Sequence, residues 1–256
     1  MQMHRSSLCA AALGVALSGL VSIATNAAVV VEYDASTAAA LPSAPDWSPE
    51  YGTDMTLSGG LLHQNTPDGG GPTFYRSKEI AGLMTRNTTD YTVEFKTQVL
   101  LDTPSSDWYT NTIVIWGDNT QSYSLIPYRN GGSGGLRTGS GTTVGNLTDV
   151  VTGVSWAAAH QFDITYSGAN DNFKIYVDGA LNTTVGANSL VLGGAAPEPY
   201  WRDRLLFGDY LTGASSNGPT QTDWSSARLF DSAVPEPTSM TLIGIAGMLA
   251  IRRKHC

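Results

Sequence analysis

Short segments in which polar and apolar residues alternate constrain the fold of this chain more than any other feature. The clearest is the segment TDYTVEFKTQVL. One face of that segment carries Tyr91, Val93, Phe95, Thr97 and Val99. The other face carries Thr92, Glu94, Lys96 and Gln98. A period of two is typical of a β-strand with one buried side, so the segment predicts such a strand.

Two further alternating segments follow, with strong turn signals after each. Gln161–Tyr166 places Phe162, Ile164 and Tyr166 inward, and Phe173–Val177 places Phe173, Ile175 and Val177 inward. The sequence SGANDN between them is rich in residues that tolerate positive φ. Asp178-Gly179 is a two-residue hairpin signal that joins FKIYV to ALNTTV.

No helical periodicity persists anywhere between the two ends of the chain. We expect further strands at Val29–Tyr33, Met55–Leu62, Thr112–Trp116, Ser122–Pro127, Leu205–Phe207 and Thr222–Phe230. Many short strands separated by turn signals predict an all-β antiparallel sandwich, with Trp116, Trp156 and Trp224 in its core. We expect long flexible loops at the glycine-rich segments Asp68–Gly71 and Asn130–Gly141.

The two ends of the chain have the composition of processing segments. Residues 1–27 combine a basic start, an apolar stretch and small residues, so they predict a signal peptide cut by signal peptidase near Ala27 or Ala28. Residues 28–233 form the expected domain, and residues 234–256 form a tail. The tail begins with Pro235-Glu236-Pro237, continues as an uncharged apolar stretch and ends in Arg252-Arg253-Lys254.

The apolar stretch of the tail is shorter than the ~20 residues of a stable membrane span, and we expect a short helix there. Arginines after an apolar stretch favour the cytoplasmic side of a membrane. This order of pieces resembles the PEP-CTERM sorting tail of Gram-negative bacterial proteins. The resemblance implies an exosortase-type processing enzyme as a partner, transient anchoring in the inner membrane, and delivery to the cell surface or beyond. The alternative is an ordinary tail anchor.

Charge and cysteine usage exclude several classes of function. The formal net charge of −8 argues against nucleic-acid binding, which needs basic groups against phosphates. Neutral sugars or cations suit such a surface better. Cys9 and Cys256 are the two cysteines, one in each processed end. The domain between them therefore has no disulfide, no thiol nucleophile and no cysteine-ligated zinc.

A second resemblance concerns the domain itself. HQFDITY, FKIYVDGAL and TDWSSARLF resemble strands of laminin-G-like jelly rolls, in the concanavalin A-like lectin/glucanase superfamily. The resemblance implies a jelly roll over residues 28–233, in which the last strand returns to pair near the first. It carries no activity by itself, because one fold hosts many functions.

Retaining glucanases of that superfamily carry an E-x-D-x-x-E pattern on one strand. Here Glu32 and Asp34 match in part, but Thr37 stands at the third position, and the residues flanking Glu94 on its face are not acidic. We therefore expect a protein that is not an enzyme, with an atypical glycoside hydrolase or polysaccharide lyase as the alternative. We interpret His63 and His160 as packing or surface residues, although a catalytic triad is assembled in space rather than in sequence.

Aromatic residues beside hydrogen-bonding groups are the candidate ligand-binding residues. Such groups occur in two expected loops, at Trp108, Tyr109 and Asn111 and at Tyr200 and Trp201. An aromatic face offers apolar area to a sugar ring, so these residues indicate polysaccharide binding. The alternative is that the rings cap the ends of the core.

Calcium is the metal that the sequence favours, because Asp and Asn offer the oxygen ligands it prefers. The candidates are Asp118, Asn119 and Asp209, and Asp118 has turn capping as its alternative role. Taken together, the sequence predicts an exported surface or matrix protein that binds extracellular polysaccharide. A purely structural surface protein is the remaining alternative.

Overall fold

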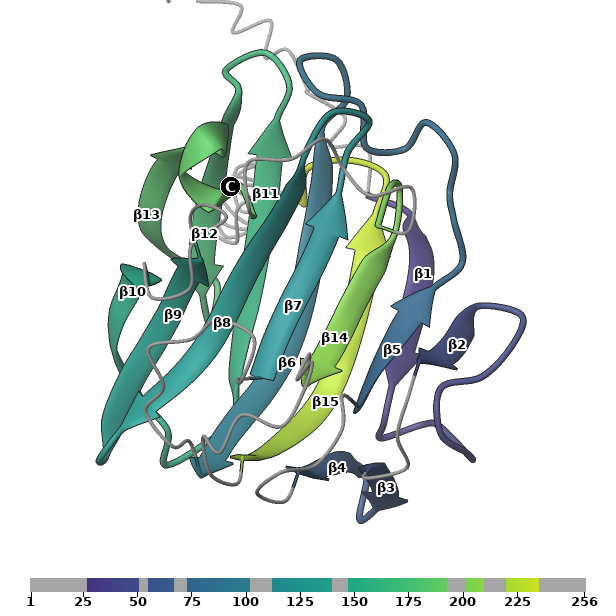
Figure 1. Cartoon of the computed structure of the whole chain (residues 1–256), viewed down its shortest axis with the longest axis vertical. Helices are drawn as coiled ribbons and strands as arrows, with labels where there is room; N and C mark the ends of the chain where they lie inside the picture. Colours follow the sequence, from purple (N-terminus) through teal and green to yellow (C-terminus); the bar gives the residue numbers. More distant parts are fainter. Residues whose placement is uncertain are drawn as a thin grey trace, which may run out of the picture.

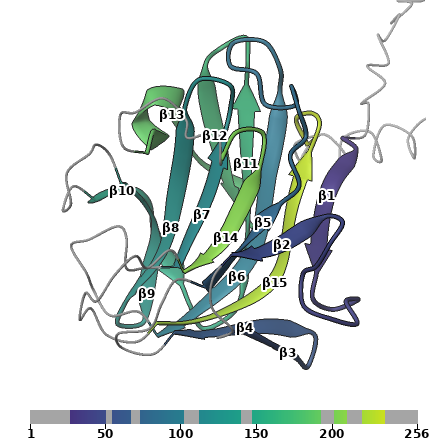
Figure 2. The ribbon, with the colours of Figure 1, turned by 45° about the vertical axis from the view of Figure 1, so that its right-hand side comes forward.

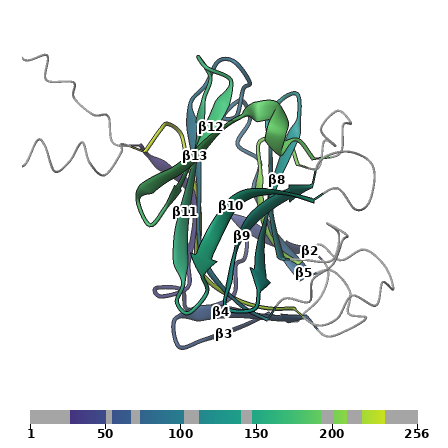
Figure 3. The same cartoon turned by 90° about the vertical axis from the view of Figure 1, so that its left-hand side faces the viewer.

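The chain folds as two antiparallel β-sheets packed face to face (Figures 1 and 3). The computed structural model describes residues 27–50, 55–66, 73–101, 112–139, 147–192, 201–209 and 220–234. Within these residues every paired strand is antiparallel, and one short 3-10 helix, η2 (Ala187–Leu190), follows the last strand of an edge hairpin. The all-β sandwich expected from the sequence is confirmed.

The first sheet has eight strands. Its order is β13 (Ala180–Gly186), β12 (Asn172–Val177), β11 (His160–Ser167), β6 (Tyr91–Leu101), β15 (Thr220–Phe230), β4 (Leu61–Thr66) and β3 (Met55–Ser58). The eighth strand, β1 (Val29–Asp34), pairs with the second half of β15. The last strand thus returns to the first, as the jelly-roll resemblance implies.

The second sheet has seven strands. Its order is β10 (Leu147–Ser155), β9 (Ser133–Gly139), β8 (Ser122–Asn130), β7 (Thr112–Gly117), β14 (Leu205–Asp209), β5 (Thr73–Ser77) and β2 (Trp47–Glu50). The hairpin β3–β4 lies across one end of the sandwich (Figure 2).

The core lies between the sheets and is built from the alternating faces that the sequence marks. Tyr91, Val93 and Phe95 of β6 are fully buried, and so are Phe162 and Ile164 of the neighbouring strand β11. The three tryptophans expected in the core, Trp116, Trp156 and Trp224, are at most 1% exposed. Ring contacts connect the two sheets, for example between Trp224 of β15 and Phe207 of β14, whose centroids lie 5.0 Å apart with the rings tilted by 59°.

Two expectations for local structure were wrong. The single strand expected at Met55–Leu62 is a hairpin, because Gly59 and Gly60 take positive φ values of 59° and 77° and reverse the chain. The loop expected over Asn130–Gly141 contains strand β9. Gly134 and Gly135 allow β9 to approach its neighbours closely: an added Cβ would lie 1.9 Å from a carbonyl oxygen at either position.

Residues 235–256 of the tail, which are expected to carry the short apolar helix, lie outside the described residues, as do residues 1–26 of the expected signal peptide and the Asp68–Gly71 segment. Within the described part of the chain, no helix has the length and apolar character needed to cross a membrane.

Candidate functional site

A row of charged side chains crosses the outer face of the eight-stranded sheet. In register, Asp163 of β11 lies opposite Glu94 of β6, Glu94 lies opposite Arg228 of β15, and Arg228 lies opposite Glu32 of β1. Side chains alternate along a strand, and the neighbours of these residues point into the core, so the row points outward. We call these four residues, together with Asp34, the charged row.

Arg228 holds the charged row together. Its Nε lies 2.6 Å from Glu32 Oε1, and its two terminal nitrogens lie 2.8 Å from Glu94 Oε1 and 2.8 Å from Asp34 Oδ2. Burial lowers the pKa of Arg228, but Glu32 and Glu94 outweigh burial, so the pKa is raised. The guanidinium therefore stays charged and fixes three carboxylates in direction as well as in place.

Glu94 and Asp163 are the buried members of the row. They are 5% and 8% exposed, and the side-chain amide of Gln161 donates to both, at 3.2 Å to Glu94 and 2.9 Å to Asp163. Burial raises the pKa of Glu94, and Arg228 opposes this in part. Burial also raises the pKa of Asp163.

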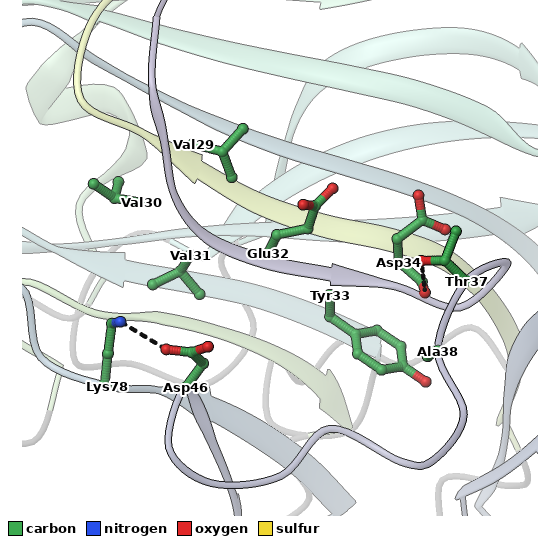
Figure 4. Close-up of a pocket in the computed structure, with 10 residues that line it drawn as sticks. All are labelled: Val29, Val30, Val31, Glu32, Tyr33, Asp34, Thr37, Ala38, Asp46 and Lys78. Atoms are coloured by element: carbon green, nitrogen blue, oxygen red, sulfur yellow. Dashed lines mark hydrogen bonds and ion pairs between the residues drawn. The ribbon is translucent and has the colours of Figure 1, made fainter.

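A polar pocket of about 480 Å³ lies along β1, at the end of the charged row (Figure 4). We call it the β1 groove. Its lining residues are Val29, Val30, Val31, Glu32, Tyr33, Asp34, Thr37, Ala38, Asp46 and Lys78. Lys78 Nζ lies 2.6 Å from Asp46 Oδ1. Asp34 accepts hydrogen bonds from the backbone and hydroxyl of Ser36, which lower its pKa with the help of Arg228, against a smaller effect of burial. Asp34 is therefore an ionised acceptor, held in a fixed direction, for hydroxyl or amino groups.

The outer face of the seven-stranded sheet has the opposite character. Phe74, Ile113, Ile115, Ile126, Leu192 and Leu206 form an apolar cluster there, each at most 4% exposed. The half-buried ring of Trp201 packs against this cluster, so Trp201 has a packing role. The other candidate ligand-binding residues, Trp108, Tyr109, Asn111 and Tyr200, lie outside the described residues.

The candidate calcium ligands lie in two separate places. Asp118 caps its turn: Oδ1 accepts from the backbone N–H of Thr120 and of Gln121, both at 2.6 Å, and Oδ2 accepts from the Tyr123 hydroxyl. The next residue, Asn119, accepts a hydrogen bond from the Arg86 backbone. Asp209 pairs with Thr112, at the far end of β7 from Asp118. Among the described residues, no three His, Cys, Asp or Glu side chains are grouped to hold a metal ion.

Both histidines of the domain bridge a carboxylate and a backbone carbonyl. His160 Nδ1 lies 2.7 Å from Asp178 Oδ2, and its Nε2 lies 2.7 Å from the Ser155 carbonyl. His63 makes the same pair of contacts with Asp223 and with the Ser58 carbonyl. Each ring has both nitrogens engaged without a serine hydroxyl, which agrees with packing roles.

Reading the sequence alone did not find the charged row. The residues that flank Glu94 along its strand are not acidic, and nothing within their own strands marks Asp163 or Arg228 as members of such a row. The row depends on which residues lie opposite one another on neighbouring strands, and the alternation within one strand does not give that register. Knowing that the HQFDITY and YTVEFKT segments pair would have placed Asp163 opposite Glu94.

Comparisons with known proteins bear on the tail and on the fold of the domain. Residues 233–254 match the PEP-CTERM protein-sorting motif. No curated protein matches the chain in sequence. The structure is similar to the carbohydrate esterase vb_24B_21 from Shiga toxin-encoding bacteriophage phi24B, with a TM-score of 0.60 and 11% identity over 81% of this chain and 100% of that one.

Two other solved structures show the same architecture. The apo Crh5 transglycosylase has a TM-score of 0.50 and 16% identity, over 82% of this chain and 87% of that one. The binding domain of botulinum neurotoxin serotype G has a TM-score of 0.52 and 10% identity, over 86% of this chain and 51% of that one. These likenesses show that the domain has the jelly-roll fold, and the sorting motif marks an exported protein of the cell envelope or surface.

Proposed function

We propose that this exported protein binds a neutral or amino-bearing polysaccharide at the cell surface or in the extracellular matrix, without cleaving it. In this proposal, signal peptidase cuts the N-terminal segment of the precursor. The tail anchors the precursor briefly in the inner membrane of a Gram-negative cell until an exosortase-type enzyme removes it. The observation that carries the binding proposal is the β1 groove, with carboxylates that ion pairs hold in fixed directions.

The chemistry of the groove selects the class of polymer. Glu32 and Asp34 offer acceptors to sugar hydroxyl or amino groups on one side of β1, and the Asp46–Lys78 pair offers an acceptor and a donor on the other side (Figure 4). Acceptors that are already oriented lose little side-chain entropy when a ligand binds. The net charge of −8 disfavours polyanions.

The aromatic residues predicted from the sequence are a second proposed contact region. Trp108, Tyr109, Tyr200 and Trp201 would supply stacking surface and Asn111 would supply hydrogen-bonding groups, with calcium bound at Asp118, Asn119 or Asp209. The groove and this region make separate predictions, because β1 is a strand of the eight-stranded sheet, whereas Trp201 packs against the seven-stranded sheet.

Paired variants test the groove. Glu32→Gln combined with Asp34→Asn should weaken retention on a neutral polysaccharide column at least tenfold. Asp149→Asn is the matched control, because Asp149 has an arginine partner and an exposure of 45%, against 46% for Glu32. Equal retention of the two variants would reject the groove. Loss of retention in Trp108→Ala with Trp201→Ala would move the site to the aromatic residues.

One observation favours an enzyme as the second candidate. Glu94 and Asp163 are adjacent carboxyl groups with raised pKa values, as an acid–base pair requires. Release of reducing ends or unsaturated products by the wild type, abolished in Glu94→Gln, would support it. Both groups are hydrogen-bonded to Gln161 and nearly inaccessible, which favours the binding role.

A further inference from the structure

The start of the sorting tail is fastened to the outer face of the eight-stranded sheet. The Thr92 hydroxyl of β6 donates to the Ser232 carbonyl at 3.1 Å and accepts from the Val234 backbone N–H at 3.1 Å. It also shares a hydrogen bond of 3.1 Å with the Thr165 hydroxyl. Thr92 thus fixes the chain at the residue before Pro235-Glu236-Pro237.

A pocket of about 280 Å³ lies beside Val234, the last residue that Thr92 holds. Its lining residues are Asp90, Thr165, Tyr166, Ser167, Asn170, Lys174, Tyr176, Ala233 and Val234. Ala233 and Val234, the last described residues before the motif, form part of its wall. The motif therefore follows directly in sequence from the rim of a pocket that contains an outward tyrosine, Tyr176, and a lysine, Lys174.

The register of the strands places Lys174 within reach of Glu236. Thr92 lies opposite Thr165, and Thr165 lies opposite Lys174. The backbone of Lys174 is therefore two strands, or roughly 10 Å, from that of Thr92. Glu236 is two residues beyond Val234, a reach of about 7 Å in an extended chain. The lysine side chain covers the remaining distance.

The chemistry of the motif matches the lining of the pocket. Proline fixes φ and favours an extended conformation in itself and in the preceding residue, so the motif is a stiff, extended peptide. Peptides of this kind bind grooves that contain aromatic rings, and Tyr176 lines this pocket from the outer face of the sheet, opposite Asp163 in register. Glu236 is the one charged residue between Asp231 and Arg252, and Lys174 has the complementary charge.

We propose that this pocket binds the Pro235-Glu236-Pro237 motif of the chain itself, with Lys174 paired to Glu236. This inference is independent of polysaccharide binding, because the β1 groove and the pocket share no lining residue. The folded domain holds its own sorting signal, and the signal must leave the pocket before a processing enzyme takes it.

Cysteine crosslinking in the full-length precursor tests the docking. Cys9 and Cys256 are first replaced by serine, and the precursor is produced in a host without a sorting system. Lys174→Cys with Glu236→Cys should form an intramolecular disulfide at least tenfold faster than Lys96→Cys with Glu236→Cys. Lys96 is the matched control because it lies on the same outer face of β6, about 13 Å along the strand from Thr92.

The outcomes are read by peptide mapping under mild oxidation. Fast crosslinking of the Lys174 pair, lost in denaturant, supports docking, whereas equal rates for the two pairs in the folded precursor would overturn it. In a host that processes the tail, Lys174→Gln should lose its tail several-fold faster than Lys96→Gln. Equal processing rates would overturn the claim that docking delays processing.

Discussion

The two outer faces of the sandwich are both buried in their centres, but by opposite means. On the eight-stranded sheet, Glu94 and Asp163 are covered together with Arg228 and Gln161 in a network of ion pairs and hydrogen bonds. On the seven-stranded sheet, Ile113, Ile115 and their neighbours form an apolar cluster. The stability of the first face depends on ion-pair partners and on pH, whereas the stability of the second depends on the apolar area that is removed from water.

This difference assigns the two faces different roles. An apolar cluster stabilises a sheet and offers few directed contacts. A charged row offers directed acceptors, and it costs desolvation energy to keep them. The pocket proposed to bind the Pro235-Glu236-Pro237 motif lies on the eight-stranded sheet, and strand β1 of that sheet forms one wall of the β1 groove. Variants on the two outer faces test this division.

The largest effect is expected from Arg228→Met. It leaves the buried carboxylate of Glu94 without its cation, which costs about 4 kcal/mol of unfolding free energy at pH 7. Burial raises the pKa of Glu94, so at pH 5 more of that group is protonated and the loss should be smaller. Urea unfolding at both pH values measures this.

Lys78→Met is the control, because it breaks a pair in which both side chains are nearly half exposed, with an expected cost under about 1 kcal/mol. Similar losses for Arg228→Met and Lys78→Met would show that the charged row does not stabilise the sheet.

A smaller effect without pH dependence is expected on the other face. Ile115→Ala removes a fully buried side chain from the apolar cluster and should cost about 3 kcal/mol. The same unfolding experiment at pH 5 and pH 7 should give equal losses. A loss of unfolding free energy that changes with pH would contradict the proposed difference between the two faces.

The smallest effect is expected from Asp178→Asn, in the turn between β12 and β13. Burial lowers the pKa of His160, but the hydrogen bonds to Asp178 and to the Ser155 carbonyl outweigh it, so the pKa is raised. The stability that His160 contributes is therefore present below pH ~6.5 and lost as pH rises through the folded pKa.

Asp178 is more than half exposed, so Asp178→Asn should cost under about 1 kcal/mol, and only at low pH. An NMR titration of His160 should show its pKa fall in this variant. An unchanged pKa would mean that Asp178 does not hold the proton on His160.

The inward faces of the strands were predictable from the sequence, because alternation within one strand is a local property. Phe95, Phe162 and Phe173 are all fully buried where the pattern places them. The hairpin after Asp178-Gly179 also follows from local turn chemistry, and Asp178 has the positive φ of 51° that such a turn requires.

The outward features were not predictable in the same way. Arg228 meets Glu32 and Glu94 across strands that are far apart in the sequence, so register decides the contact. Strand β9 was missed because glycine usually marks a loop, whereas Gly134 and Gly135 serve close packing between strands. Long-range pairing sets both features.

The most direct test of the account uses the exported, processed protein and a panel of neutral, basic and acidic polysaccharides, with calcium or with chelator. Retention and product formation are read from the same samples. The account predicts saturable retention on a neutral or basic polymer that remains intact, and chelator sensitivity would add calcium to the site. Polymer cleavage would contradict it in favour of an enzyme, and no retention on any polymer would leave a purely structural surface protein.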